Sequence, residues 1–356
     1  MRIVVNDIAA STTGALSILK DFYGYIREHD REHEWIFILS GPYLEETDRI
    51  KVVIKGDLKR WKNRLVFDYV KGAAYFEALK PDVLFSMQNT LVRNYHGKQA
   101  VYVHQPLGFQ KEKKFSFLKK EEREYAIYQY VIAKMIDASI KRADHVFVQT
   151  NWMKAAVIAK THISEERIST ALPDIELSGH AERRVFDSHQ FFFPSGDILY
   201  KNHACIFEAV QELRKMGAGG FRILLTLTEK EAEAIPGYEQ AKRYLQCLGR
   251  ISREEVFSLY ANSTLVFPSY IETFGYPLAE ARAVGTMVLA SDCAFSNELL
   301  DGYKNAFFFP PFEPKILAKL MYQVMRGEIS LQHVKEDCHL KSHSWEMVTN
   351  TLLSLK

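Results

Sequence analysis

The sequence contains little cysteine, and its few cysteines follow no pattern. There are four in 356 residues, and no two of them form a C-x-x-C pair. Scattered thiols argue against a disulfide framework and against a zinc site built on cysteine, and they are typical of a reducing compartment. We therefore expect a cytoplasmic protein with reduced thiols. The four residues are Cys205, Cys247, Cys293 and Cys338.

Long hydrophobic runs and a strong net charge are also lacking. No uninterrupted apolar run reaches the roughly 20 residues that a membrane-spanning helix needs. The first residues, MRIVVNDIAA, do not have the layout of a signal peptide. The formal net charge of +2 excludes a globally basic nucleic-acid-binding protein, although not a local basic patch. Any membrane contact is therefore expected to be peripheral, on the inner face of the plasma membrane.

Familiar metal and phosphate signatures are absent. The sequence has no D-x-D pair of the kind that holds a divalent metal on a nucleotide diphosphate, no H-E-x-x-H and no P-loop. We therefore expect neither a metal ion nor a cofactor.

The first half of the chain alternates short apolar runs with helical patterns. Runs rich in β-branched residues, separated by helices such as 67–79 and 121–143, favour a parallel α/β sheet over a sandwich. The expected strands are Arg2–Val5, Trp35–Leu39, Lys51–Ile54, Asp82–Ser86, Ala100–His104 and His145–Gln149.

A polar, proline-containing stretch then interrupts this periodicity, and a second α/β series follows it. We predict a Rossmann-like domain over residues 1–170, a linker over 171–190 and a second Rossmann-like domain over 191–335. The tail from Pro314 to Lys356 has a helical pattern throughout, and residues 336–356 are expected to pack back on the first domain. Two tandem sheets of this kind place a ligand in the cleft between their strand ends.

Two glutamates, Glu272 and Glu280, stand on either side of an aromatic-Gly-aromatic-Pro turn that follows the expected strand TLVFPS. Pro277 suits the first position of a helix, which places Glu280 in the first turn. A helix start attracts phosphate, and carboxylates beside it can accept hydrogen bonds from the hydroxyl groups of a nucleotide-sugar. The alternative is that Glu280 only complements the helix dipole and Glu272 is solvated.

The stretch PSYIETFGYPLAEARAVGTMVLASD resembles the donor-site signature of family-4 glycosyltransferases, which have the two-domain GT-B fold. The resemblance implies that Glu272 contacts the donor sugar, that Glu280 holds the ribose hydroxyls, and that the backbone of 273–275 approaches the sugar and diphosphate. Ser269 is implied in donor binding with them. The matching residues are Pro268, Ser269, Glu272, Phe274, Gly275, Pro277, Glu280, Ala281, Gly285, Ser291 and Asp292, and Thr273 and Phe274 are implied in donor binding through their backbone.

A lysine, Lys201, follows the expected strand FFFP and precedes a helix, in a Lys-Asn-His form that resembles bacterial polysaccharide transferases. A cation there can neutralise the donor diphosphate as it leaves. The family usually has an arginine a few residues earlier, which this sequence lacks, and Arg250 is the candidate substitute. The alternative interpretation is a solvated lysine in front of a helix.

Further candidates lie in the first half of the chain. His104, at the end of a strand and before a proline turn, resembles the family's histidine that lines the reaction centre, although such residues are often structural. Gly14, between the first strand and helix, resembles the glycine loop that faces the diphosphate and acceptor. The strand end Phe85–Asn89 resembles an acceptor-facing segment.

Two segments, 56–67 and 109–120, combine lysine and arginine with apolar residues, namely Trp61, Phe115, Phe117 and Leu118. Basic residues beside exposed aromatics can dock on anionic lipid, but a charge run is as often a solvated face. The sequence leaves both interpretations open.

The resemblance implies a retaining, metal-independent glycosyltransferase. It would move a hexosyl or related sugar from a UDP-, GDP- or dTDP-sugar to a hydroxyl acceptor, a lipid-linked or growing glycan of a bacterial capsule, exopolysaccharide or O-antigen. Lys201, Glu272 and His104 are the expected catalytic residues. Two alternatives stay open: a non-catalytic nucleotide-sugar-binding partner of a transferase, and a nucleotide-sugar epimerase of the same fold.

Overall fold

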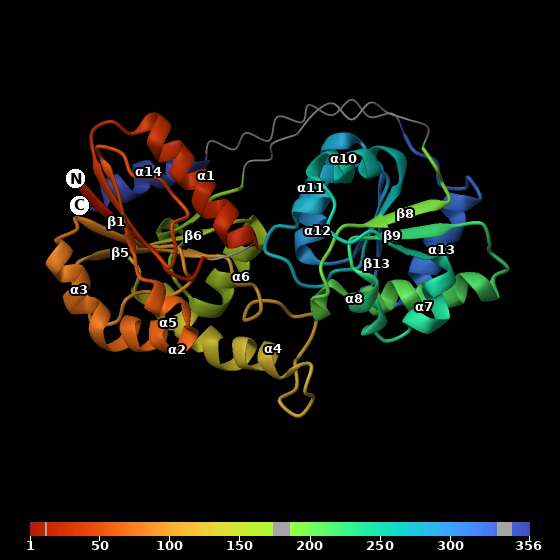
Figure 1. Cartoon of the computed structure of the whole chain (residues 1–356), viewed down its shortest axis with the longest axis horizontal. Coiled ribbons are helices and arrows are strands. Elements are labelled where there is room, and N and C mark those ends of the chain that lie inside the picture. The colour runs from red at the N-terminus through yellow and green to blue at the C-terminus, as the bar shows by residue number, and fades with distance from the viewer. Residues whose placement is uncertain (11–12, 174–185, 333–343) are drawn as a thin grey trace.

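The computed structural model describes residues 1–10, 13–173, 186–332 and 344–356, which form two domains, each built on a parallel sheet (Figure 1). In the first sheet the strands lie in the order β3-β2-β1-β4-β5-β6-β7. Chain order therefore reverses between β1 and β4, where a parallel sheet opens a site beyond its strand ends. The strands are β1 (Arg2–Asp7), β2 (Glu34–Leu39), β3 (Ile50–Ile54), β4 (Val83–Ser86), β5 (Lys98–Val103), β6 (His145–Val148) and β7 (Ile168–Thr170).

The second sheet repeats this topology with the order β10-β9-β8-β11-β12-β13, so its reversal falls between β8 and β11. The predicted fold class, two Rossmann-like parallel-sheet domains, is confirmed. The strands are β8 (Gln190–Phe193), β9 (Arg222–Leu225), β10 (Leu245–Cys247), β11 (Thr264–Phe267), β12 (Val288–Ser291) and β13 (Ala306–Phe309).

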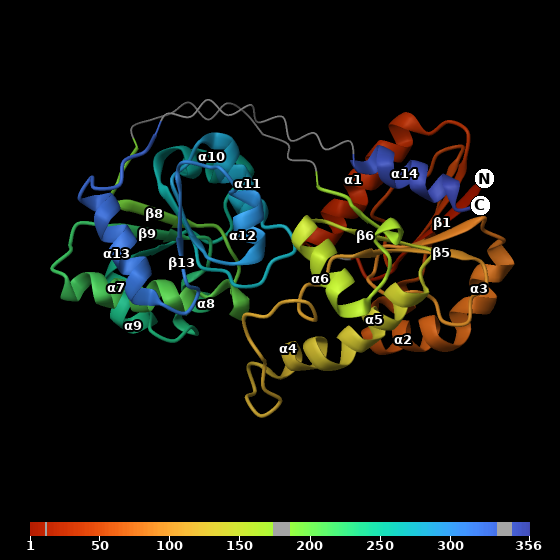
Figure 2. The same ribbon diagram turned by 180° about the vertical axis from the view of Figure 1, so that it is seen from behind.

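Helices cover both faces of each sheet (Figures 1 and 2). A π-helical turn, Phe67–Lys71, connects α2 to α3, and a second one, Tyr128–Ile132, connects α4 to α5. The helices are α1 (Thr13–His29), α2 (Trp61–Val66), α3 (Gly72–Leu79), α4 (Arg123–Ile127), α5 (Ala133–Arg142), α6 (Asn151–Thr161), α7 (His203–Lys215), α8 (Glu229–Glu233), α9 (Tyr238–Ala241), α10 (Arg253–Asn262), α11 (Tyr276–Val284), α12 (Ala294–Leu299), α13 (Pro314–Met325) and α14 (Ser344–Ser354).

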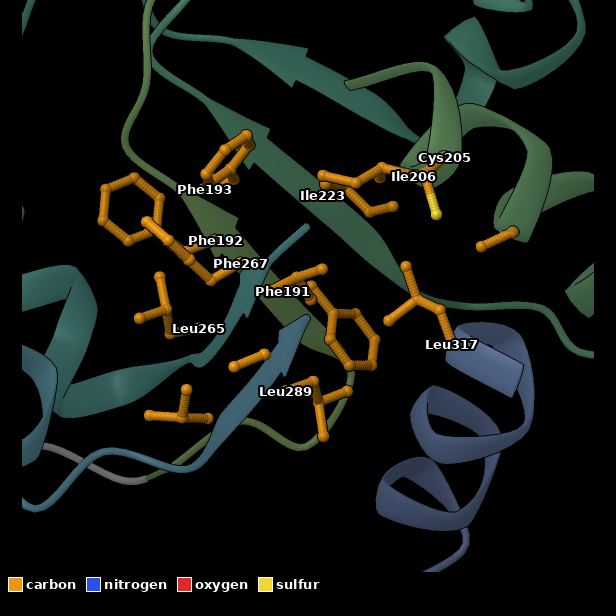
Figure 3. Packing of buried hydrophobic residues seen from close by; sticks show 14 of the residues in the cluster. Phe191, Phe192, Phe193, Cys205, Ile206, Ile223, Leu265, Phe267, Leu289 and Leu317 are labelled. Atoms are coloured by element: carbon orange, nitrogen blue, oxygen red, sulfur yellow. The ribbon is translucent and has the colours of Figure 1, made fainter. Parts of the chain in front are cut away.

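The central strand β8 shows why these short runs form strands. Phe191, Phe192 and Phe193 are consecutive and all fully buried, because neighbouring side chains of a strand point to opposite faces and helices cover both. In Figure 3 the Phe191 ring lies near Leu317 of α13. The Phe192 ring is on the opposite face of the sheet, where it packs against Tyr260 of α10 with ring centroids 5.7 Å apart. Burying each ring contributes about 1.5–3 kcal/mol, so this run anchors the second domain.

The last helix, α14, lies on the first domain beside α1, close to the N-terminus (Figures 1 and 2). Its Trp345 ring packs against Phe22 of α1, with ring centroids 5.0 Å apart, and against Tyr102 of β5 at 6.0 Å. The end of the chain therefore completes the core of the first domain.

Two expectations about the chain's secondary structure are wrong. The tail is not helical throughout, because α13 ends at Met325 and Gly327 adopts a left-handed conformation (φ +70°) that terminates it. Residues 326–332 are irregular, and the rest of the predicted helix before α14 lies outside the described residues. The strand β7 was not expected either, because three residues are too few to produce a periodic pattern.

Candidate active site

The candidate site lies around the loop that follows β11. Gly275 ends this loop with φ +93°, a conformation that strains any residue with a side chain, and α11 begins at Tyr276. Pro277 is therefore the second helical residue. Glu280 is the fifth helical residue and therefore lies in the second turn of α11. The expectation that it lies in the first turn was wrong.

Lys201 and Glu272 form an ion pair between the two adjoining loops of the second sheet. The Lys201 ammonium lies 2.5 Å from the Glu272 carboxylate, and both side chains are mostly buried, with 17% and 14% exposed. The loops meet because β8 and β11 are neighbours in the sheet, so their carboxyl ends adjoin. The backbone N–H of Tyr270 also donates to the Tyr200 carbonyl at 3.1 Å, which ties the loops together.

Asn202 reinforces this junction. It adopts a left-handed conformation (φ +63°) directly after Lys201, and its side-chain amide donates to the carbonyls of Pro268 (3.2 Å) and Pro311 (2.7 Å). The position of Lys201 is therefore set by three loops of the second domain.

Glu280 is held in a buried hydrogen-bonded pair with Tyr260 of α10. The Tyr260 hydroxyl donates to the Glu280 carboxylate at 3.1 Å, and the Arg253 guanidinium lies 3.4 Å from its other oxygen. Burial raises the pKa of Glu280 above its ordinary value, while Arg253 and the Tyr260 hydroxyl lower it. A carboxylate with one ordered donor and one neighbouring cation can still accept hydrogen bonds from a diol such as ribose.

Neither Tyr260 nor Arg253 was singled out from the sequence. The available signal was the capping box Ser252–Glu255, present in the structure, which marks the start of α10 and so the position of Arg253 in its first turn. That signal predicts where the helix begins, but it does not predict that Arg253 lies beside Glu280.

Thr273 connects the loop to the first domain. Its carbonyl accepts hydrogen bonds from the Thr150 hydroxyl and the Trp152 indole, both at 3.0 Å, and its hydroxyl donates to the His104 carbonyl at 3.4 Å. Nearby, the Glu298 carboxylate of α12 accepts from two backbone N–H groups at the start of α6. The loops at the carboxyl ends of both sheets therefore meet at this loop.

His104 lies at the end of β5 and contacts Asn89, which follows β4. The backbone N–H of His104 donates to the Asn89 side-chain oxygen at 2.7 Å, and the ring Nε2 lies 3.2 Å from the Asn89 amide nitrogen. Burial lowers the pKa of His104 to about 4, so the ring is neutral at neutral pH.

The other residues predicted to bind the donor lie in different surroundings. Phe274 is buried and packs edge-on against Tyr276, so its side chain shapes the loop. Ser269 is fully buried, and its carbonyl accepts a hydrogen bond from the Ser291 hydroxyl. Gly14 belongs to the first turn of α1 and not to the preceding loop, and a side chain added there would meet open space.

Arg250, the candidate second cation, lies on the surface. The pKa of Glu231 at the start of α8 is lowered mainly by hydrogen bonds from Thr228 and only slightly by the charge of Arg250. Arg250 makes no hydrogen bond or ion pair with a described residue. The structure therefore does not bring it together with Lys201.

The described parts of the chain contain neither a metal site nor a helix that could span a membrane. Residues 1–10, 13–173, 186–332 and 344–356 contain no group of three acidic, histidine or cysteine side chains placed to hold a metal ion. In the same residues no helix has the length and apolar character to cross a bilayer.

Comparison with known proteins identifies the second domain and the fold. Residues 190–338 match the family described as Glycosyl transferases group 1, whereas no curated protein sequence matches the chain. The structure is similar to the lipopolysaccharide outer core galactosyltransferase WaaB, with 14% identity, a TM-score of 0.63 and 99% of each chain covered.

Two further solved structures are similar over whole chains. They are the pneumococcal O-GlcNAc transferase GtfA in complex with UDP and GlcNAc (12% identity, TM-score 0.63, 100% of this chain and 99% of that one), and Anabaena Alr3699/HepE in complex with UDP-glucose (14% identity, TM-score 0.62, 100% and 97%). At these identities the likeness concerns the fold. The chain has the GT-B fold, and the resemblance to glycosyltransferases found in the sequence is confirmed.

Proposed function

We propose that this chain, which has the GT-B fold and whose second domain matches group 1 glycosyltransferases, transfers a sugar from a nucleotide-sugar to a hydroxyl acceptor. The observation that carries the proposal is the Lys201–Glu272 ion pair at the adjoining ends of β8 and β11. A cation and a carboxylate at this point match the two ends of a sugar diphosphate, because the ammonium suits the phosphates and the carboxylate suits the sugar hydroxyls.

In the proposed reaction Lys201 neutralises the charge that develops on the departing diphosphate. This contribution is electrostatic and works best where water is partly excluded, as it is around these mostly buried side chains. Glu272, released from the lysine by the incoming phosphate, accepts hydrogen bonds from the sugar. Glu280, held by Tyr260, binds the ribose, and His104 lines the reaction centre from the first domain.

The proposed stereochemistry is retention by displacement on one face of the sugar. The acceptor oxygen forms its bond to the anomeric carbon while the bond to the diphosphate oxygen breaks, and the acceptor proton passes to the departing diphosphate. Metal independence belongs to the same proposal, with Lys201 and the start of α11 providing the positive charge. The first donors to test are UDP-sugars, since the similar GtfA and HepE structures contain UDP and UDP-glucose.

The acceptor that we propose is a lipid-linked or growing bacterial surface glycan. The similarity to a lipopolysaccharide outer core galactosyltransferase supports this class of acceptor. It also supports a cytoplasmic enzyme that works at the inner face of the membrane.

A surface of the first domain supports peripheral contact with that membrane. Leu118 and Phe117 lie on the loop before α4 and are 92% and 45% exposed, and Lys119 and Lys120 are exposed beside them. The Phe117 ring packs at a tilt against that of Tyr130, with ring centroids 5.7 Å apart, and Tyr130 thereby extends the apolar area. Phe115 was also expected to be exposed there, but it is buried, so that expectation was wrong. The side chain of Trp61 is not among those that the structure describes.

This surface can be tested by sedimentation with phosphatidylglycerol vesicles. Leu118→Glu should reduce binding severalfold, because an apolar side chain that would enter the lipid becomes an anion that the lipid repels. Ile316→Glu is the matched control, since Ile316 is also exposed but lies on α13 of the second domain. Equal loss in both variants, or none in either, rules out this docking surface.

The proposed function is tested by donor binding and turnover together. Thermal unfolding with UDP, GDP, dTDP and their common sugars should identify one stabilising nucleotide. A ligand at a hundred times its Kd stabilises the native state by about 2.7 kcal/mol. Wild type should then release nucleotide from the sugar donor, and Glu272→Gln should not.

Two other functions give different results. A non-catalytic binding partner, favoured by the missing arginine near Lys201, would bind the donor but leave it intact even with acceptor present. An epimerase would yield a changed or free sugar with no transfer to any acceptor. Failure of every nucleotide to stabilise folded protein would refute all three.

A further inference from the structure

Asn89 adopts a backbone conformation that few residues other than glycine adopt. It follows β4 with φ +70°, in the left-handed region. The turn around it is held at several points: the Ser86 hydroxyl donates to the Thr90 carbonyl at 2.6 Å, and the Gln88 amide donates to the buried Asp68 carboxylate at 2.8 Å. Asparagine enters this region more readily than most residues, and these hydrogen bonds fix the direction in which its side chain leaves the turn.

The Asn89 side chain contacts His104 through both its oxygen and its nitrogen. Its oxygen accepts the backbone N–H of His104 at 2.7 Å, and its nitrogen lies 3.2 Å from the ring Nε2. Because the oxygen is committed to the N–H, the nitrogen must point at Nε2, and an amide nitrogen only donates. Nε2 must therefore be the acceptor, and the ring proton of His104 must be on Nδ1.

The other ring nitrogen is shielded. Nδ1 of His104 is buried and has no hydrogen-bond partner among the described residues. Nε2 is thus occupied by Asn89, and Nδ1 is covered by neighbouring atoms. What His104 presents to the second domain is its carbonyl, which accepts the Thr273 hydroxyl at 3.4 Å.

We propose that Asn89 is a positioning residue: it holds His104 as the neutral Nδ1–H tautomer and fixes the His104 backbone against the Thr273 loop. Its effect on turnover rests on the proposed transferase function, whereas its effect on the tautomer does not. The His104 ring acts as a rigid support at the strand end, and the backbone carries its contribution to the site.

The tautomer is tested by long-range ¹H–¹⁵N NMR of the histidine rings at neutral pH, with the His104 signal assigned by its loss in His104→Gln. We expect Nδ1 protonated and Nε2 unprotonated. In Asn89→Asp the carboxylate should place a proton on Nε2 and raise the pKa of His104 by more than about one unit. A protonated Nε2 in the wild type, or no change in Asn89→Asp, overturns the proposal.

Steady-state kinetics of two variants distinguish the contact of Asn89 with the His104 backbone from its contact with the ring. Asn89→Gly keeps the left-handed turn without strain and removes both contacts, so kcat/KM for the donor should fall roughly tenfold or more. Asn89→Asp keeps the contact to the backbone N–H and should lose less. Asn94→Gly is the control, because Asn94 is also left-handed (φ +62°) but exposed, and wild-type rates are expected for it.

Wild-type rates in Asn89→Gly would refute the positioning role. If wild type shows no transfer with any donor, the proposed function fails, and the ring-nitrogen signals still decide what Asn89 does to His104.

Discussion

The ammonium of Lys201 and the carboxylate of Glu272 lie 2.5 Å apart, although 71 residues separate them in the chain. Sequence periodicity predicts that each follows a strand, and the pairing of β8 with β11 brings them together. Each charge compensates the other, and this lowers the cost of holding both in a mostly buried place. A sugar diphosphate that binds there must separate them.

A double-mutant cycle measures the coupling free energy between Lys201 and Glu272. Lys201→Met and Glu272→Gln should each lower the free energy of unfolding by about 1–2 kcal/mol, because each leaves a mostly buried charge without its partner. The double variant should cost less than their sum. Urea denaturation provides the values.

The exposed pair of Lys242 and Glu239, 2.7 Å apart on the surface, is the matched control cycle. Its coupling should lie within the error of the measurement, because water screens both charges. If the Lys201–Glu272 coupling is no larger, the pair does not stabilise the site.

The Tyr260 hydroxyl supports Glu280 by direct hydrogen bonding. Tyr260→Phe should destabilise the protein by about 1–2 kcal/mol and weaken nucleotide binding about tenfold, because the buried carboxylate loses its donor. The measurements are urea denaturation and calorimetric titration. Tyr238→Phe removes a similar bond to Glu229, away from the site, and should leave nucleotide affinity unchanged. Equal affinity in both variants contradicts the role of Tyr260.

Glu298 links the two domains by capping a helix of its neighbour. Its carboxylate accepts the N–H groups of Asn151 (2.8 Å) and Trp152 (2.6 Å), at the positive end of the α6 dipole. Glu298→Gln should therefore weaken the domain contact by about 1–2 kcal/mol. Small-angle scattering should report a larger radius of gyration than in Asp301→Asn, an exposed control. An unchanged radius would mean that other contacts hold the domains together.

Asp68, on the π-helical turn, makes stability depend on pH in an unusual direction. Burial raises its pKa to about 7, with Arg64, Asn6 and Gln88 lowering it. In the unfolded chain an aspartate ionises near pH 4. Between these values only the folded state keeps the proton, so the contribution of Asp68 is complete below about pH 4 and is lost as pH rises to about 7.

Asp68→Asn should abolish this dependence. Relative to the variant, wild type should lose stability by about 1 kcal/mol per pH unit between pH 5 and 7, as measured by urea denaturation. The asparagine oxygen can still accept the Gln88 amide, so the variant should fold normally. The exposed Asp57→Asn serves as the reference variant. If the free energy of unfolding changes with pH in the same way in wild type and in Asp68→Asn, then Asp68 is ionised in the folded state throughout this pH range.

Much of the fold could be predicted from particular runs of residues. Parallel strands buried on both faces require continuous apolar segments, and IVV in β1, FIL in β2 and FFF in β8 are such segments, so these strands could be recognised without a structure. The donor-site motif likewise gave Glu272, Gly275 and Glu280 on a loop and the helix after it. The exact helix start was missed by one residue, which moved Glu280 to the second turn, because terminal residues carry weak signals.

Other features had no readable pattern. Arg253 meets Glu280, Asn89 meets His104, and Glu298 meets the start of α6, each across a long stretch of chain. None of these residue types is unusual where it stands.

The sequence by itself determined which segments become strands and helices, and which polar residues stand at strand ends, because periodicity and turn chemistry are local properties. The tertiary structure alone decided which of those residues meet. The order of strands in each sheet sets the partners of Lys201 and Glu280, and the docking of the two domains sets those of Thr273 and Glu298. Such contacts depend on the packing of apolar faces over the whole molecule, which leaves no mark at the positions that it brings together.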